Sequence, residues 1–393
     1  MSLPLTRKPA ELLHGRQVSF SNGNNPTDFD IQTSSNPQDF ERLQREWDEL
    51  CHRENIESPF LECDWFHAWW KAFGANHQLK LITIRQGGQL QAVLPLMMGR
   101  VWVFGIPCRR LGAISNDHSP LFDLAISGAS RGIHQAIWEH LLSSRADWDI
   151  LDLPQLPAHS DTFVLFREYA TQEGIRHSIW DQAPGAPWVD TQTSWEEYLQ
   201  DRSKGFRKAL RRKLRGLSKE GDFALETLTD ADAIDKALGD GFRIEAAGWK
   251  SHEKTAITSA GEALEFYTTL ARVQSRKGNL RLHFLILNGR RIAFDYSIVK
   301  HKRLYSLKSG LDYRHARQSP GTLLLYLILQ KAHDEGLIEV DLLGNTDAFK
   351  MQWTHKVRPS QWMLIYSFSK RARLLFTLKI RMLPAIRELV TLD

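Results

Sequence analysis

Alternating apolar and polar positions in the second half of the chain predict several strands around one helix. Residues 280–287 and 291–299 read as two strands joined by Asn288-Gly289, a dipeptide favoured in tight hairpin turns. Beyond them, the pattern predicts strands at 303–309, 338–343 and 361–368 and helices at 320–335 and 347–354. This order predicts a mixed α/β sheet with one central crossover helix.

The first half carries a matching hairpin. Residues 79–94 form two strand-like runs around Gly87-Gly88, and at an offset of 201 residues Leu79 falls on Leu280 and Gly88 on Gly289 without a gap. A helical segment with large aromatic residues precedes each hairpin. Strand-turn-strand patterns recur by chance, so one matched hairpin is weak evidence. Together with the length of the chain, it favours duplication of a domain. We therefore expect two related α/β domains in tandem.

The length of the chain and its polar or Pro/Gly-rich segments indicate the domain boundaries. At 393 residues the chain exceeds the usual size of a single hydrophobic core. A polar start and the segment Ala183-Pro184-Gly185-Ala186-Pro187 mark two breaks. The expected units are a loose leader at 1–30, an N-terminal domain at 31–185, a C-terminal domain at 186–368 and an amphipathic basic helix at 369–393. Tryptophans at helical spacings near the start of the first domain are expected in its core.

Positive charge is concentrated in one predicted helix. Between Arg202 and Lys219 lie nine basic residues and no acidic one. Four apolar residues share a face of this helix, which is expected to dock by that stripe: Phe206, Leu210, Leu214 and Leu217. The basic face predicts an anionic partner, or else it is a solvated surface. The tail at 369–393 fits either docking on the core or contact with an anionic surface.

Composition excludes several classes of protein. The hydrophobic share of 42% and the charged share of 25% are ordinary for a globular protein and exclude disorder as the main state. Cys51, Cys63 and Cys108 are too few and too unevenly spaced for a disulfide framework or a zinc site. No signal peptide or transmembrane segment is expected. We expect a cytoplasmic protein, with peripheral contact to the inner membrane surface as an alternative.

Ser319-Pro320-Gly321 opens the strongly apolar helix at 320–335. Serine is a good N-cap, and proline suits the first helical position because its missing N–H would have no partner inside the helix. Gly321 lets nearby backbone N–H groups approach a ligand closely. A helix N-terminus favours phosphate or carboxylate, so the segment reads equally well as a phosphate cradle or as a plain, well-capped helix.

Several motifs of this half resemble the CelD/BcsL-like GNAT acyltransferases, which are associated with cellulose and exopolysaccharide biosynthesis and related to the Fem aminoacyl transferases. The matching segments are 307–313, 319–324, 341–353, the basic helix around 207–215 and 245–250. The resemblance implies two tandem GNAT-like domains and acetyl-CoA or another acyl-CoA as donor. It also implies that Gln318, Ser319, Gly321 and Thr322 bind the donor pyrophosphate. Ala348-Phe349 departs from the family, which usually has an acidic residue and tyrosine there, so a role for that tyrosine hydroxyl is lost.

Acyl transfer needs a held thioester, a polarised carbonyl and a proton acceptor. The candidate catalytic residues are Asp295 and Glu245 as base and Lys350 as electrostatic partner. The candidate residues for binding the acceptor or other substrate groups are Trp249, Lys250, Lys308 and Asp312. Alternation along its strand places Asp295 on the face opposite Phe294 and Tyr296. Asp295 and Lys350 also fit exposed surface positions, and Trp249 and Lys250 fit a loop anchor.

Two remaining features of the sequence bear on catalysis and on metal binding. Asn116-Asp117-His118 reads as a catalytic pair or, more commonly, as a structural turn. No close His/Cys grouping appears, so we expect metal-free chemistry.

The leading hypothesis is acyl transfer from acyl-CoA to a sugar, lipid-linked or amine acceptor in exopolysaccharide or envelope formation. One alternative is a Fem-like transferase that uses aminoacyl-tRNA, with the helix at 202–219 contacting RNA phosphate. Another is a GNAT-fold module without activity that binds RNA or an anionic membrane surface through the same helix.

Overall fold

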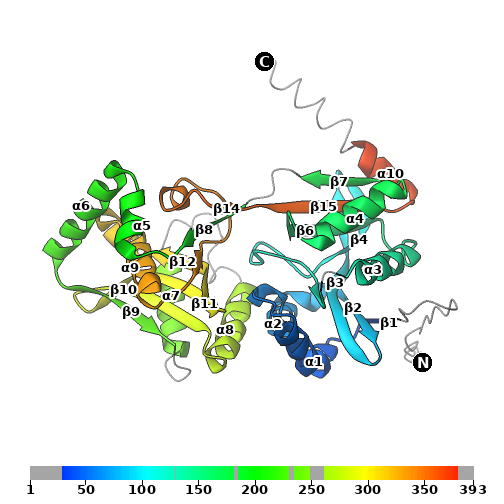
Figure 1. The fold of residues 1–393 in the computed structure, drawn as a ribbon, viewed down its shortest axis with the longest axis horizontal. Coiled ribbons are helices and arrows are strands. Elements are labelled where there is room, and N and C mark those ends of the chain that lie inside the picture. The colour runs from blue at the N-terminus through cyan, green and yellow to red at the C-terminus, as the bar shows by residue number, and fades with distance from the viewer. Residues whose placement is uncertain (1–28, 129, 181–184, 230–233, 248–260, 379–393) are drawn as a thin grey trace, which may run out of the picture.

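A computed structural model gives the structure of the chain and describes residues 29–128, 130–180, 185–229, 234–247 and 261–378. The chain forms two sheets, one in each half, with helices on their faces (Figure 1). Most of the expected leader lies outside the described residues, and Asp30 already belongs to the first strand. No helix among the described residues is long and apolar enough to cross a membrane.

The first sheet has the strand order β1-β2-β3-β4-β6-β15-β7, and β5 pairs with β3 beside this path. Its strands are β1 (Asp30–Ser34), β2 (Gln78–Gln86), β3 (Gln89–Val103), β4 (Ile106–Ala113), β5 (Ala125–Ile126), β6 (Ile150–Pro157), β7 (His177–Trp180) and β15 (Ser360–Tyr366). Its helices are α1 (Asp39–Arg53), α2 (Cys63–Phe73), α3 (Arg131–Ser143) and α4 (Asp161–Gln172). The tryptophans of α1 and α2 are buried in the core, as expected from their spacing.

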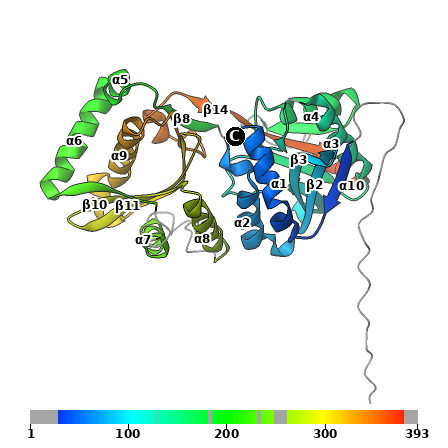
Figure 2. The same cartoon turned by 60° about the horizontal axis from the view of Figure 1, so that its bottom comes forward.

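The second sheet has the order β14-β8-β13-β12-β11-β10-β9. Its strands are β8 (Ala186–Asp190), β9 (Phe223–Leu228), β10 (Leu280–Leu287), β11 (Arg290–Lys300), β12 (Arg303–Leu311), β13 (Glu339–Asp341) and β14 (Val357–Arg358). Its helices are α5 (Trp195–Asp201), α6 (Lys204–Glu220), α7 (Ile234–Ala246), α8 (Gly261–Arg276) and α9 (Pro320–Asp334). Helices α6 and α9 cover one face of this sheet, and α7 and α8 cover the other (Figure 2).

The two hairpins found in the sequence are equivalent in the structure. Asn288 and Gly289 have φ values of 49° and 76°, and Gly87 and Gly88 have values of 57° and 82°, so both turns use left-handed backbone. The β2–β3 register shifts between Ile84 and Arg85, and the β10–β11 register shifts between Leu285 and Ile286. The bulges therefore keep the offset of 201 residues, which supports duplication of one unit.

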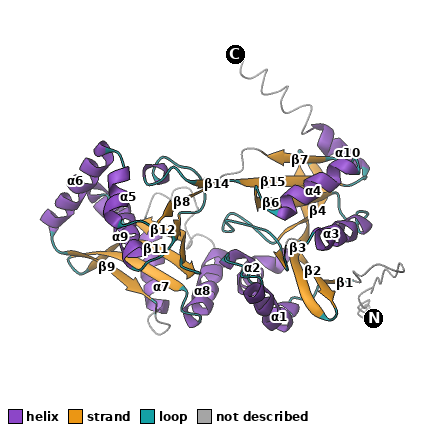
Figure 3. Cartoon of the chain, viewed as in Figure 1, coloured by secondary structure: helices purple, strands orange, loops and turns teal. Residues whose placement is uncertain are grey.

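The strand predicted at 361–368 is present as β15, but its expected place in the C-terminal sheet is wrong. It pairs with β6 and β7 of the first sheet, with Leu364 opposite Asp152 on one side and Ser178 on the other (Figure 3). In the equivalent place of the second sheet, β8 lies between β13 and β14. The C-terminal half therefore contributes β15 to the first sheet, whereas β8 lies in the sheet of its own half. Alternating side chains identify a strand but not the sheet that it joins.

The halves also pack together through side chains. Trp65 of α2 meets Phe266 of α8 edge-on at 5.2 Å between ring centroids, and Phe60 meets Tyr305 of β12 at 5.3 Å. One hydrophobic cluster continues from α1 and α2 into α7, α8 and β10. The Lys300 ammonium lies 2.6 Å from the Glu62 carboxylate across the same boundary.

The tail helix expected at 369–393 can be compared only up to residue 378, because the rest lies outside the described residues. Within this part α10 (Lys370–Thr377) is helical, and Ala372 and Leu375 pack beside Cys108. The helix predicted at 347–354 is wrong: the structure has only a 3-10 turn there, Lys350–Gln352, and the Asp347 side chain accepts the Lys350 N–H at its start.

Candidate active site

The second sheet opens where β12 and β13 separate. Their parallel pairing ends at Tyr305 opposite Asp341, whereas β12 continues to Leu311. Leu343 and Gly344 follow β13 with φ values of 50° and 59° and turn the chain away. An Asp341 side-chain oxygen accepts the Leu343 N–H at 2.9 Å, which stabilises this turn. The result is a gap between two strands that are neighbours at their other ends.

One cavity of about 880 Å³ fills this gap on the α9 side, and we call it the α9-side cavity. Seven residues predicted from the sequence line it, namely Glu245, Asp295, Lys308, Ser319, Gly321, Thr322 and Lys350. The remaining lining is mostly aliphatic and aromatic, from β12, α9 and the loop after β13. Trp249 and Lys250 lie outside the described residues. The structure therefore brings most of the candidate site together around one space.

The start of α9 has an unexpected geometry. Ser319 is the N-cap residue, as predicted, but its backbone is left-handed, with φ 56° and ψ 50°, and its side chain caps no helix N–H. The predicted capping role of the hydroxyl is therefore wrong, since a capping side chain requires extended backbone at that position. A Cβ built on Gly321 would lie 3.4 Å from Leu311 Cδ2, and both residues line the α9-side cavity.

A lysine that the sequence did not single out lies at this helix start. Lys213 of α6 donates a hydrogen bond from Nζ to the Thr322 hydroxyl, with a distance of 3.0 Å. Burial, with a smaller effect from Arg212, lowers the pKa of Lys213. The only sequence signal was its position beside Leu210 and Leu214, at the border of the apolar stripe. Helix dipole and ammonium together make this corner favourable for an anion.

Asp295 lies on β11 and is 4% exposed. Its two carboxylate oxygens accept hydrogen bonds from the hydroxyls of Ser297 and Ser306. The neighbours Phe294 and Tyr296 pack with the α7 and α8 side of the sheet, so alternation leaves Asp295 on the α9 side, as the sequence predicted. Hydroxyl donors on both oxygens stabilise a carboxylate that burial would otherwise disfavour.

Glu245 and Lys308 form a buried pair. Glu245 lies near the end of α7 with 1% exposure, and its Oε1 is 3.6 Å from Lys308 Nζ on β12. Gly310 makes this approach possible, because a Cβ there would lie 2.5 Å from the Glu245 Cα. The glycine is therefore required by packing of α7 on β12.

Lys350 stabilises the turn after β13. Its Nζ donates to the Leu343 carbonyl at 2.8 Å and lies 3.6 Å from the Asp347 carboxylate. Burial lowers its pKa, and Asp347 opposes this shift. Lys350 thus shapes the opening of the gap in addition to lining the α9-side cavity.

Asp312 and Gln318 do not join the other candidates in the lining. Asp312 accepts the Arg314 N–H at 3.0 Å, which caps the 3-10 turn Tyr313–Gln318, and it pairs with the Arg314 guanidinium at 2.6 Å. It lines a different cavity, of about 480 Å³. The structure therefore does not support Asp312 as a substrate-binding residue. Gln318 precedes Ser319 and has a buried side-chain oxygen with no hydrogen-bond partner among the described residues.

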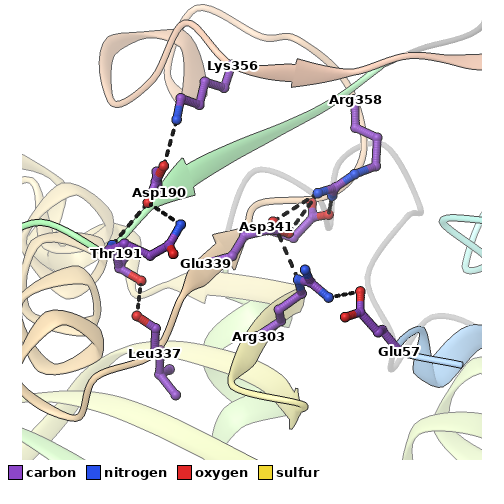
Figure 4. Close-up of polar contacts among 10 residues, drawn as sticks. Glu57, Asp190, Thr191, Arg303, Leu337, Glu339, Asp341, Lys356 and Arg358 are labelled. Carbon is purple, nitrogen blue, oxygen red and sulfur yellow. Dashed lines mark hydrogen bonds and ion pairs between the residues drawn. The ribbon is translucent and has the colours of Figure 1, made fainter. Parts of the chain in front are cut away.

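A second cavity, of about 620 Å³, lies between the halves, and we call it the interhalf cavity. Ion pairs lie along the side of this cavity that the C-terminal half forms (Figure 4). Arg358 binds Glu339 at 2.9 Å and Asp341 at 2.5 Å, and Arg303 pairs with Glu57 of the N-terminal half. Burial raises the pKa of Asp341 to about 6, although Arg358 opposes the shift.

The two cavities meet at the gap between β12 and β13. Four residues line both of them, namely Leu307, Lys308, Leu343 and Gly344. Lys308 is the charged residue among these four. A molecule in the α9-side cavity can therefore present a reactive group, through the gap, to a second molecule in the interhalf cavity.

Three kinds of comparison with known proteins bear on the chain. The family model of the acetyltransferase (GNAT) domain matches residues 204–351. A search of curated protein sequences finds no significant match. Solved structures give several similar folds, at low sequence identity.

The first is a domain assigned as the C-terminal domain of lysylphosphatidylglycerol synthetase from Agrobacterium fabrum, with 13% identity, a TM-score of 0.53 and coverage of 87% of this chain and 96% of that one. FemX has 10% identity and a TM-score of 0.54, covering 81% of this chain and 95% of its own. L-PGS from Bacillus licheniformis has 10% identity and a TM-score of 0.51, with 87% and 96% covered.

At these identities the similar structures show the fold alone. Their alignments extend over both sheets, and the family model covers the β12–β13 gap and the start of α9. The predicted fold class is confirmed: the chain has a mixed α/β fold with two tandem GNAT-like units, and residues 204–351 match the acetyltransferase (GNAT) domain.

Proposed function

We propose that the chain is an acyl-CoA-dependent acyltransferase whose donor occupies the α9-side cavity and whose acceptor occupies the interhalf cavity. The observation that carries this proposal is the junction of the two cavities at Lys308 and the β12–β13 gap. The volume of about 880 Å³ is within the range of cofactor sites. The donor phosphates lie at the start of α9, beside Lys213.

The polar side chains around the gap have complementary roles in this scheme. Lys308 lies at the junction and stabilises negative charge that develops on the thioester oxygen. Glu245 holds the Lys308 ammonium in place from α7. Asp295 and Lys350 line the donor side, where Lys350 also maintains the shape of the gap through the Leu343 carbonyl.

The acceptor class follows from the resemblance of the motifs at 307–313, 319–324 and 341–353 to the CelD/BcsL-like enzymes. It is a sugar, a lipid-linked molecule or an amine in exopolysaccharide or envelope formation. The reaction then takes place in the cytoplasm or at the inner membrane surface. The domain limits at 31–185 and 186–368 remain part of the proposal, with β15 of the second unit placed in the first sheet.

The basic helix supports a competing function. Helix α6 exposes six of its basic side chains, and FemX is among the similar structures. An aminoacyl-tRNA donor, or RNA or membrane binding without catalysis, would use this surface through its positive charge. Lys213, however, turns toward α9 and Thr322, which favours a donor phosphate within the cavity.

Calorimetric titration with acetyl-CoA tests the proposal. Gly321→Asp places a carboxylate in the donor cavity beside the expected phosphates, so we expect at least a tenfold loss of affinity. Gly239→Asp is the matched control, because a side chain at Gly239 on α7 meets nothing within 4 Å. Absence of acetyl-CoA binding at millimolar concentration, together with salt-sensitive RNA binding, would overturn the proposal. Equal affinity of the two variants would show that the donor site is misplaced.

A further inference from the structure

His118 belongs to the N-terminal half, yet it lines the interhalf cavity opposite β12. The turn reading of its sequence is correct for the backbone, since the Asn116 side chain accepts the His118 N–H at 3.0 Å. The imidazole itself lies at the boundary between α2 and α8, where residues of both halves contact it.

Three aromatic side chains fix the imidazole ring. Phe73 of α2 stacks on it at 5.7 Å between centroids with an interplanar angle of 10°. Tyr267 of α8 meets it edge-on at 5.5 Å, and the Tyr267 hydroxyl lies 3.3 Å from Nδ1. Phe266 also contacts the ring. No hydrogen bond within the described chain reaches Nε2, so the second ring nitrogen is available to a molecule in the cavity.

Burial, helped by the charge of Lys308, keeps the ring of His118 neutral. Burial is the main cause that lowers its pKa to about 4, and Lys308 of β12 acts in the same direction, whereas Asp117 opposes it. Tyr267, the titratable group on α8, is itself buried and has a raised pKa. At neutral pH the imidazole therefore carries a lone pair on one nitrogen, which is the form that accepts a proton.

The acidic side chains of the same cavity are less suitable as bases. Glu339 and Asp341 pair with Arg358, and Glu57 pairs with Arg303. The arginine partners occupy these carboxylate oxygens, whereas no hydrogen bond within the described chain reaches His118 Nε2. Asp295 and Glu245 line the α9-side cavity, on the donor side of the gap.

We propose that His118 is a catalytic base for the acceptor, supplied by the N-terminal half to the acyl transfer at the β12–β13 gap. The inference rests on the proposed function. The nucleophilic nitrogen or oxygen of the acceptor attacks the thioester carbonyl carbon and forms the new acyl bond. The C–S bond breaks, and its electron pair leaves on sulfur. The proton lost by the nucleophile moves to His118 Nε2 and then to the thiolate. Tyr267 is a positioning residue that accepts the Nδ1–H and so leaves the lone pair on Nε2.

His118→Gln and His118→Ala in the full chain test this role, with the exposed His159→Gln as control. Acetyl-CoA affinity is measured by calorimetry, and thiol release from acetyl-CoA is measured with hydroxylamine as acceptor probe. We expect both His118 variants to bind acetyl-CoA within twofold of the original chain. Thiol release falls about 100-fold to 10,000-fold, the usual contribution of a general base. Added imidazole restores part of the rate in His118→Ala but not in His118→Gln, where the cavity is filled.

Tyr267→Phe keeps the ring and removes the hydroxyl, so we expect kcat to fall about tenfold with KM nearly unchanged. Equal thiol release by His118→Gln and the original chain overturns the inference. Acetyl-CoA binding without thiol release in the original chain overturns it as well. Failure of the original chain to bind acetyl-CoA is a separate result, because it contradicts the proposed function itself.

Discussion

Asp341 shows how one buried carboxylate at the end of β13 links the site to stability. Burial raises its pKa to about 6, above the roughly 3.9 of an unfolded aspartate. The folded chain therefore binds this proton more tightly than the unfolded chain. The stabilisation is fully present below about pH 4 and is lost as the pH rises through about 6.

Asp341→Asn removes this titration while keeping an oxygen for the Leu343 N–H. We expect the stability of the original chain relative to Asp341→Asn to fall by about 2 kcal/mol between pH 4 and pH 7, because most of the titration between the two pKa values lies in this range. Urea unfolding at several pH values measures it, and the exposed Asp334→Asn serves as control. A difference that stays constant with pH would contradict the assignment.

Single residues were predicted with uneven success, for physical reasons. Asp295 was placed on the correct face because a strand alternates its side chains. Ser319 was correctly placed at the start of α9, but its left-handed backbone follows from the preceding 3-10 turn, which leaves no periodic signal. The contacts of Lys213 and His118 depend on segments more than 100 residues away, which local sequence does not specify.

At the scale of one element, helix α6 separates its charges into two groups. Leu210 and Leu217 are buried on its apolar face, and Lys213 beside them reaches Thr322. Lys208 is exposed. If the donor phosphates lie at the start of α9, Lys213 contributes a charge-assisted contact and Lys208 does not.

Lys213→Ala is expected to raise the KM for acetyl-CoA about tenfold, the equivalent of roughly 1.4 kcal/mol, because a hydrogen bond to a charged group contributes at least that much. Lys208→Ala on the same helix leaves KM within twofold. S-acetyl-pantetheine, which lacks the nucleotide phosphates, is expected to react equally with both variants. Equal KM values for acetyl-CoA in the two variants would instead show that Lys213 does not contact the donor and that the basic face of α6 is only a solvated surface.

Most elements followed from periodicity, whereas strand partners did not. Asn288-Gly289 and the alternation around it specified β10 and β11, because turn geometry and the side-chain period act locally. Strand β15 was recognised as a strand, but its pairing with β6 and β7 is set by contacts between distant segments. The 3-10 turn at Lys350–Gln352 was misread as a helix because three residues carry too little pattern.

At the scale of the whole molecule, strand β15 joins the two units. Strand β15 completes the first sheet, and β8 lies inside the second. The acceptor side of the proposed site also needs both halves, since Glu57 and His118 face Arg303 and Lys308 across the interhalf cavity. We therefore expect neither half to keep its full structure or its site without the other.

A chain that ends at residue 359, which keeps β14, tests this coupling, with a chain that ends at residue 369 as control. The shorter chain loses β15, whose Met363, Ile365 and Tyr366 are buried between β6 and β7. Burial of each such side chain contributes about 1.5–3 kcal/mol, so the first sheet loses several kcal/mol of the roughly 5–15 typical of a folded domain.

Thermal unfolding followed by circular dichroism and tryptophan fluorescence measures the effect. We expect the chain ending at 369 to unfold in a single transition close to that of the full chain, because α10 is the one element that it loses among the described residues. The chain ending at 359 is expected to unfold at least 10 °C lower, or to remain partly unfolded, because β6 and β7 lose the strand between them. Equal transition temperatures for the two shortened chains would show that β15 is not required by the first sheet, and the halves would then be independent units that share only a surface.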